Sequence, residues 1–345
     1  MRFSSRFRVH GVAALQFLVG FGAVALLGWA VWKLYPRPST PPGWQVFRPP
    51  YDVMALAEYR GAIWAGGKDG LYCFRLDENV STAWQEPASL GFPIPPLKGV
   101  TALAVAQAGN QLWVGHGGGV SVFDGVSWKT FNIADGLPDD QILAVAVTPD
   151  DELWVGSPKG VARFSKGQWQ VFSTKDGLAN PAVSVIFPDR QGNIWFGNGY
   201  TLEGGLTVFD GVTWRIFTPQ DGLAHPMVNA IIEDQAGNLW FGTGFSSQGG
   251  ANRFDGVEWQ ILTQEDGLAG AKVRSLMVDS QGGLWFGSEY DGVARFYQGG
   301  WKIFTPRQGL SGWEVKAMLE DSGGSLWLGT ENGITRIQSF LKNLP

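Results

Sequence analysis

The chain has 345 residues, a net charge of −5 and 44% hydrophobic residues, and its length allows two ordinary domains. Glycine and tryptophan are unusually frequent, with 49 and 17 residues, and no Gly-X-Y period accompanies the glycines, which excludes collagen. The aromatic content excludes a largely disordered chain, and the single cysteine, Cys73, excludes an intrachain disulfide and a cysteine-based zinc site. Residues 1–43 carry five basic side chains and no acidic one, so the remainder is acidic, which argues against nucleic acid as a partner.

The first apolar segment, residues 11–32, contains no charged side chain. As a helix it would span about 33 Å, which is enough for a hydrocarbon core of roughly 30 Å. Three arginines precede it, so the positive-inside rule predicts that residues 1–10 form a cytoplasmic basic segment and that everything after the helix is extracytoplasmic. We expect an uncleaved transmembrane signal-anchor helix, with a cleaved signal peptide as the alternative. Residues 33–43 are proline-rich and predict a linker.

The rest of the chain is dominated by an internal repeat, a four-residue block with the order hydrophobic residue, Trp, hydrophobic residue, Gly. This block is centred on Trp64, Trp113, Trp154, Trp195, Trp240, Trp285 and Trp327, and a second tryptophan series consists of Trp44, Trp84, Trp128, Trp169, Trp214, Trp259 and Trp301. Each unit contains four short apolar runs separated by turn residues, for example 228–233, 239–243, 251–254 and 258–262. The pattern predicts an all-β, seven-bladed β-propeller of four-stranded blades over residues 44–345.

The two ends of the repeat region complement each other. The seventh unit lacks its fourth strand, and residues 44–47 form a fourth strand without a unit of its own. We therefore predict that this N-terminal strand completes the last blade, which would leave no open blade edge. The fourteen tryptophans at the two repeat positions are expected to pack between neighbouring blades.

The residues then point to a known family. The stretches FDGVTWRIFTPQDGL (209–223) and VNAIIEDQAGNLWFGT (228–243) resemble the two-component regulator propeller repeat. This resemblance implies an extracytoplasmic ligand-sensor domain, often one that responds to carbohydrate-related signals. We find no recognisable kinase or DNA-binding region after the last repeat, so the resemblance implies signalling through a separate partner such as a kinase.

Candidate binding residues lie in the loops of the predicted propeller. Two neighbouring units have longer loops between their second and third strands, and these loops supply Tyr200 and Phe245, although neutral loop variation is the alternative. Trp313 is the one propeller tryptophan outside both repeat positions, and it either contacts a ligand or packs at the rim. His225 occupies the connection between two units.

One position into the innermost strand, the seven units place Met54, Thr101, Leu143, Ser184, Asn229, Arg274 and Lys316. Arg274 and Lys316 belong to adjacent blades and would bind a carboxylate or sulfate if they point toward the tunnel mouth. The alternative is that these two charges are solvated or neutralised by salt bridges. With Asn229, they complete the candidate ligand-binding set.

Signals for chemistry are few. The aspartates at 189, 234, 279 and 321 recur in one turn, which indicates a structural role rather than a metal loop. His225 beside Arg274 and Glu314 would make a lyase-like set, as in propellers of the virginiamycin B lyase family. We expect no enzymatic activity, metal or cofactor. The sequence predicts a membrane-anchored, extracytoplasmic propeller that binds a small ligand or an envelope protein and signals through a partner, with a scaffold subunit of an envelope complex as the alternative and a lyase as the minor one.

Overall fold

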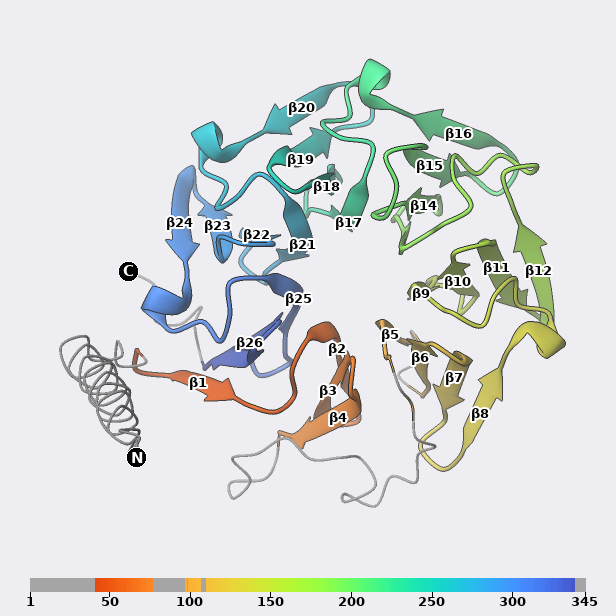
Figure 1. The fold of residues 1–345 in the computed structure, drawn as a ribbon, viewed down its shortest axis with the longest axis horizontal. Coiled ribbons are helices and arrows are strands. Elements are labelled where there is room, and N and C mark those ends of the chain that lie inside the picture. The colour runs from red at the N-terminus through yellow and green to blue at the C-terminus, as the bar shows by residue number, and fades with distance from the viewer. Residues whose placement is uncertain (1–40, 77–96, 98, 107–109, 339–345) are drawn as a thin grey trace, which may run out of the picture. The chain divides into compact units, whose positions relative to one another are not determined.

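The computed structural model describes residues 41–76, 97, 99–106 and 110–338, which belong to the unit Pro41–Pro345. In this unit, seven antiparallel sheets are arranged around a centre (Figure 1). Six sheets have four strands, and the sheet β2-β3-β4 has three among the described residues. The strand predicted around Trp84 lies outside them. The prediction of an all-β, seven-bladed propeller is confirmed.

The strands of each sheet follow one another from the centre of the ring outward (Figure 1). The innermost strands are β2 (Val53–Tyr59), β5 (Ala102–Val105), β9 (Ala144–Val147), β13 (Val185–Pro188), β17 (Val228–Glu233), β21 (Val273–Val278) and β25 (Val315–Glu320). The second strands are β3 (Ala62–Gly67), β6 (Leu112–His116), β10 (Leu153–Ser157), β14 (Ile194–Gly197), β18 (Leu239–Phe245), β22 (Leu284–Ser288) and β26 (Leu326–Thr330).

The two outer positions complete each sheet. The third strands are β4 (Gly70–Arg75), β7 (Gly119–Phe123), β11 (Gly160–Ser165), β15 (Leu206–Phe209), β19 (Gln248–Phe254), β23 (Val293–Tyr297) and β27 (Gly333–Ile337). The outermost strands are β8 (Trp128–Phe131), β12 (Gln168–Phe172), β16 (Trp214–Phe217), β20 (Trp259–Leu262), β24 (Gly300–Phe304) and β1 (Trp44–Phe47).

The outermost strand β1 pairs antiparallel with β27, in a register that runs from Trp44 opposite Ile337 to Phe47 opposite Ile334. This sheet therefore combines one strand from the start of the unit with three from its end (Figure 1). The buried ring of Phe47 contacts Trp327 of the same sheet at a centroid distance of 6.1 Å. It also lies 5.4 Å from Phe74 of the neighbouring sheet, so β1 contributes to the core on both sides.

The tryptophans of the second strands form the core between sheets, where all seven side chains are buried. Trp154 packs edge-on against Phe196 of the next sheet at 5.5 Å, and Trp195 packs against Phe241 of the sheet after that at 5.6 Å. Burial of each large side chain stabilises the fold by about 1.5–3 kcal/mol. The expected core role of these second-strand tryptophans is confirmed.

Short 3-10 helices follow four of the outermost strands: η2 (Ile133–Asp135), η3 (Pro219–Asp221), η4 (Gln264–Asp266) and η5 (Pro306–Gln308). Each is closed by a glycine with a positive φ, such as Gly267 at +124° after η4. A Cβ atom at Gly267 would lie 2.4 Å from the indole of Trp301 in the next sheet. The glycine is therefore required both by the backbone conformation and by the close contact between sheets.

Three predicted segments lie wholly or largely outside the described residues: the basic segment 1–10, the apolar segment 11–32 and most of the linker 33–43. Among the residues described, no helix combines the length and apolar character needed to cross a membrane.

Candidate functional site

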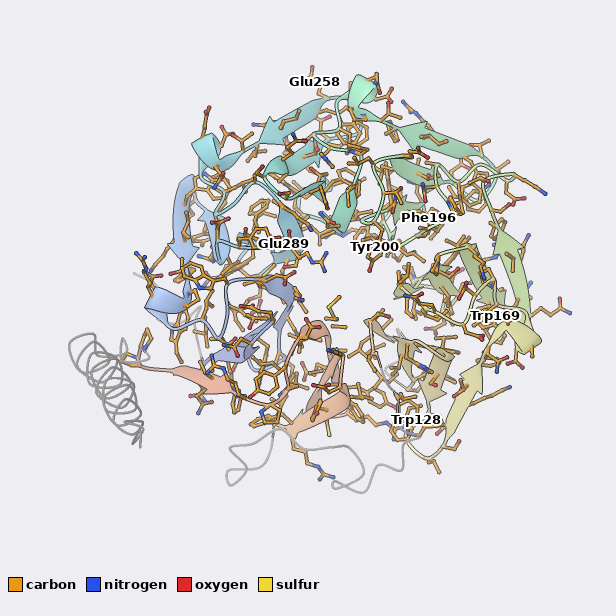
Figure 2. All side chains as sticks on the ribbon, viewed as in Figure 1. Trp128, Trp169, Phe196, Tyr200, Glu258 and Glu289 are labelled. Carbon is orange, nitrogen blue, oxygen red and sulfur yellow. The ribbon has the colours of Figure 1, made fainter. Side chains whose placement is uncertain are left out.

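The seven residues that the repeat aligns on the innermost strands line one cavity of about 100 Å³ at the centre of the ring. They are Met54, Thr101, Leu143, Ser184, Asn229, Arg274 and Lys316, and Gly199 and Tyr200 complete the wall. Figure 2 shows Tyr200 close to the central opening, whereas Trp128 and Trp169 lie at the outer edge of their sheets. The structure thus brings four of the candidate site residues together: Tyr200, Asn229, Arg274 and Lys316.

A backbone irregularity accompanies these positions in four sheets. The strand pairing skips a residue between Val53 and Ala55, and the same shift recurs in the sheets that start with β17, β21 and β25. The skipped residues are Met54, Asn229, Arg274 and Lys316. A β-bulge re-aims a side chain that would otherwise follow the regular alternation of the strand. The bulges therefore direct these four side chains toward the cavity.

The two cations at the cavity are neutralised by carboxylates. Arg274 Nε lies 3.2 Å from Glu314 Oε1, and Lys316 Nζ lies 3.0 Å from Glu314 Oε2. Lys316 also donates a hydrogen bond to Asp52. Burial acts to lower the pKa of Lys316, but its hydrogen bonds to Asp52 and Glu314 outweigh burial and raise this pKa above its ordinary value. Lys316 therefore stays charged, and an anionic ligand would compete with Glu314 for Arg274 and Lys316.

Asn229 presents an acceptor at the same cavity. Its Nδ2 donates to the carbonyl oxygens of Gly244 and Val273, both at 3.1 Å. Its Oδ1 is buried and has no hydrogen-bond partner among the residues that the structure describes. Buried polar atoms without partners are uncommon, because desolvation is then not compensated. This oxygen can accept a hydrogen bond from a ligand donor.

The loops around the cavity form one continuous edge, which we call the tunnel-mouth rim. The connections between sheets contact the loops between second and third strands: Asn180 Nδ2 donates to the Glu203 carbonyl at 2.8 Å, and the Trp313 amide donates to Glu331 at 2.9 Å. The rim carries all the strongly exposed aromatic side chains of the described residues: Tyr51 (44%), Tyr200 (55%), Phe245 (53%), Tyr290 (62%) and Trp313 (42%). They come from five consecutive sheets, whereas the exposed apolar residues of the outer strands are aliphatic.

His225 lies apart from this cavity. Its side chain is buried, and its Nδ1 accepts a hydrogen bond from the Met227 amide at 3.1 Å. Burial lowers the pKa of His225, and the charge of Lys272 lowers it further. Lys272 is itself buried and pairs with Glu289 at 2.9 Å, with its Nζ 5.9 Å from the ring centre of Phe245. Of the expected set of His225, Arg274 and Glu314, the last two form an ion pair, whereas His225 contacts the Met227 amide and feels the charge of Lys272.

Sequence reasoning missed two of the rim aromatics. Tyr51 precedes Met54 by three residues, just as Trp313 precedes Lys316, so the alignment that singled out Trp313 contained a signal for Tyr51. Tyr290 lies in a short loop between second and third strands, and no insertion marks it. The charge of Glu289, with desolvation, raises the pKa of the Tyr290 hydroxyl, which keeps this hydroxyl a donor at neutral pH.

The described part of the chain contains no group of three or more His, Cys, Asp or Glu side chains placed to hold a metal ion. The recurring turn aspartates instead accept hydrogen bonds from tryptophans of their own sheets, as Asp189 does from Trp195 Nε1 at 2.8 Å. These aspartates therefore have a structural role, because they stabilise the turns and hydrogen-bond to core tryptophans.

Comparison with solved structures supports the fold. The chain matches the extracellular domain of the hybrid two-component system protein BT3049 from B. thetaiotaomicron with a TM-score of 0.66 and 17% identity, over 83% of this chain and 40% of that one. It matches PorZ, a surface component of the type-IX secretion system of Porphyromonas gingivalis, with a TM-score of 0.63 and 14% identity, over 84% and 46%. A virginiamycin B lyase from Staphylococcus aureus matches with a TM-score of 0.64 and 14% identity, over 85% and 98%.

This chain therefore spans less than half the length of the first two proteins. No curated protein sequence matches it. The two-component regulator propeller family matches residues 177–200, 222–245 and 267–290, each of which runs from the glycine after an outermost strand to the rim loop of the following sheet. The chain is therefore a seven-bladed β-propeller, three segments of which match the two-component regulator propeller model.

Proposed function

We propose that this propeller is a sensor-type binding module that takes up an extracytoplasmic ligand at the tunnel-mouth rim and acts through a separate partner protein. The observation that carries the proposal is the gathering of exposed aromatic side chains on this one rim, around a cavity lined by cations and by a free amide oxygen. Pockets of this kind combine apolar surface with a few convergent polar groups. Carbohydrates are the first ligand class to test, because Trp and Tyr rings pack against flat apolar faces while their polar atoms hydrogen-bond.

Binding of soluble oligosaccharides, measured by calorimetry, tests this proposal. We expect saturable binding that weakens about tenfold or more in Trp313→Ala, because an aromatic anchor contributes at least 1.4 kcal/mol, which corresponds to one decade in Kd. Val257→Ala is the matched control, since Val257 is 85% exposed on a hairpin turn between third and fourth strands, at the opposite end of its sheet from the rim. Equal loss in both variants would contradict binding at the rim.

A scaffold subunit of an envelope complex is the second candidate. It is favoured by the same rim, because exposed aromatic residues beside charged ones are typical of protein interfaces. In this case a stable protein partner would co-purify without added ligand and would be lost in a Tyr290→Ala, Trp313→Ala double variant. Co-purification that the double variant leaves unchanged would argue against docking at the rim.

We favour binding over catalysis. His225 is buried with one ring nitrogen engaged by the Met227 amide, and Glu314 is shared by two cations, so neither group is poised to transfer a proton. Turnover of a streptogramin or other substrate that disappears in His225→Ala would overturn this preference.

We further propose that residues 11–32 anchor the propeller outside the cytoplasm. The uncharged length of this segment and the arginines before it support the proposal. External protease should then degrade the propeller in intact spheroplasts after mild denaturation, and alkaline carbonate should leave the chain in the membrane fraction. Release by carbonate would contradict the anchor.

A further inference from the structure

A recurring aspartate closes the turn between the first and second strands in four sheets. One of its oxygens, Oδ1, accepts the amide of the residue four positions on, and the other, Oδ2, accepts the indole N–H of the tryptophan six positions on. The aspartates are Asp189, Asp234, Asp279 and Asp321, and their indole bonds measure 2.8–2.9 Å. Oδ1 thus closes the turn, and Oδ2 satisfies the indole N–H of a core tryptophan.

In the sheet β9–β12, Thr148 occupies this position. Its Oγ1 accepts the Glu152 amide at 3.0 Å, so the bond that closes the turn is kept. A threonine has no second oxygen to replace Oδ2. Trp154, six positions on, is 1% exposed, and its Nε1 has no hydrogen-bond partner within the described ranges. The substitution of Thr for Asp therefore leaves a buried donor without its acceptor.

A second buried donor without an acceptor in the described part of the chain, the Nε of Arg163, belongs to the residue opposite Trp154. Arg163 lies directly across the strand pair from Trp154, and its buried Nε also lacks a partner among the described residues. In the sheet β21–β24, the equivalent Arg295 Nε donates to Asp279 Oδ2 at 2.8 Å, the same oxygen that Trp285 Nε1 binds at 2.8 Å. One carboxylate oxygen can therefore serve both donors.

The arginine by itself would not mark a site. Arg336 Nε lacks an acceptor too, although its sheet has the turn aspartate Asp321 and the indole of Trp327 is bonded to that aspartate. The distinguishing feature of the sheet β9–β12 is that the indole Nε1 of Trp154 and the Nε of Arg163 both lack an acceptor among the described residues, although another nitrogen of Arg163 donates to Gln170 Oε1 at 2.8 Å.

Trp154 and Arg163, which carry these two buried donors, line a cavity of about 510 Å³ between the sheets β9–β12 and β13–β16. Its walls include Thr148, the carboxylates of Asp150, Glu152 and Asp189, and the apolar side chains of Pro188, Ile194 and Phe209. It lies at the turns between first and second strands, which are at the opposite ends of the strands from the tunnel-mouth rim. We name it the indole–guanidinium pocket, and it is separate from the rim.

We propose that the indole–guanidinium pocket binds a carboxylate, with one oxygen placed where the missing aspartate oxygen would lie. In the sheet β21–β24, Asp279 accepts both kinds of bond that the ligand would receive: a charge-assisted hydrogen bond from a guanidinium and a hydrogen bond from an indole N–H. The apolar walls favour a carboxylate on a ring or hydrocarbon chain. Glu152 opposes binding, because its Oε2 lies 3.7 Å from an Arg163 nitrogen and competes for this cation. This inference is independent of the proposed function.

Thr148→Asp supplies the carboxylate from within the chain and gives the sharpest test. Benzoate should raise the melting temperature of the full-length protein, and benzamide, its neutral counterpart, should not. The affinity for benzoate should fall about tenfold or more in Thr148→Asp, since the new side chain fills the acceptor position. It should tighten severalfold in Glu152→Gln, because a competing charge is removed.

The indole N–H signal of Trp154, assigned by its loss in Trp154→Phe, provides a readout of binding in the wild-type protein. Benzoate should shift this signal and leave that of Trp285 unchanged. Should Thr148→Asp fail to fold, Arg163→Met, which retains the hydrocarbon part of the side chain, should abolish the shift instead.

A carboxylate can come from a free acid or from an acidic side chain of another protein, and N-acetyl-aspartate amide represents the second source. A response to either compound supports the proposal and identifies the source. No shift of the Trp154 signal with either compound, or equal benzoate affinity in the wild type and Thr148→Asp, overturns it.

Discussion

Trp44 and Ile337 are direct partners in an antiparallel strand pair, although they lie near opposite ends of the propeller unit. The strand β1 therefore depends on a contact that the chain can make only when the last sheet is in place. The same strand brings Phe47 against Trp327 and Phe74, which belong to two different sheets.

Phe47→Ala is expected to lower the free energy of unfolding by about 3–5 kcal/mol, because it removes a buried ring that joins the first and last sheets. Urea unfolding followed by tryptophan fluorescence measures the change. Gln45→Ala on the same strand is the control and should stay within about 0.5 kcal/mol, since Gln45 is exposed. A Phe47 variant as stable as the Gln45 variant would show that β1 does not hold the ring closed.

Asp279→Thr is expected to destabilise the protein by about 3 kcal/mol. The change recreates the Thr148 arrangement in a sheet where the carboxylate pairs with the buried Arg295 at 2.7 Å and accepts the indole of Trp285. Thermal or urea unfolding provides the measurement. Asp255→Thr, in an exposed hairpin turn, should cost about 1 kcal/mol or less; an equal loss in the two variants would argue against a special role for the buried carboxylate.

His225 should titrate below its ordinary pKa of 6.5, since burial and then the charge of Lys272 disfavour the protonated ring. At a pH near 6.5 and below, the folded state thus binds fewer protons at His225 than the unfolded state does. The contribution of the neutral ring to the free energy of unfolding is therefore fully present above pH 6.5 and is lost as the pH falls below this value. NMR titration of the ring should show a low midpoint.

Lys272→Met separates the two causes. The midpoint of His225 should rise when the lysine charge is removed but stay below 6.5, because burial remains. A midpoint that does not change would show that the charge of Lys272 has no influence on the ring.

Cys73 should be unreactive in the folded protein. Burial raises the pKa of its thiol to about 12, and the nearby charge of Arg75 only partly offsets this effect. Native protein at about pH 8 should therefore react very slowly with a disulfide reagent, whereas the unfolded chain should release one equivalent of product. Rapid reaction of the native protein would mean that the sheet β2-β3-β4 opens readily.

The repeat in the sequence determined the all-β class, the number of sheets and the residues that occupy the centre. These features follow from local patterns, because alternating apolar positions, turn residues and a constant spacing repeat in every unit. Even the seven residues around the cavity could be aligned without coordinates, and Arg274 and Lys316 do lie together there.

Only the tertiary structure decided which polar groups are already satisfied. Glu314 neutralises Lys316 within its own segment and Arg274 from the neighbouring sheet. The spacing of one unit cannot encode the second of these contacts, and no insertion in the sequence marks Tyr290 as a rim residue. That the indole N–H of Trp154 lacks a hydrogen-bond partner among the described residues is likewise visible only in the tertiary structure. A substitution from Asp to Thr is readable in the sequence, but its consequence depends on whether another group reaches the vacated acceptor position, and packing between neighbouring sheets determines that.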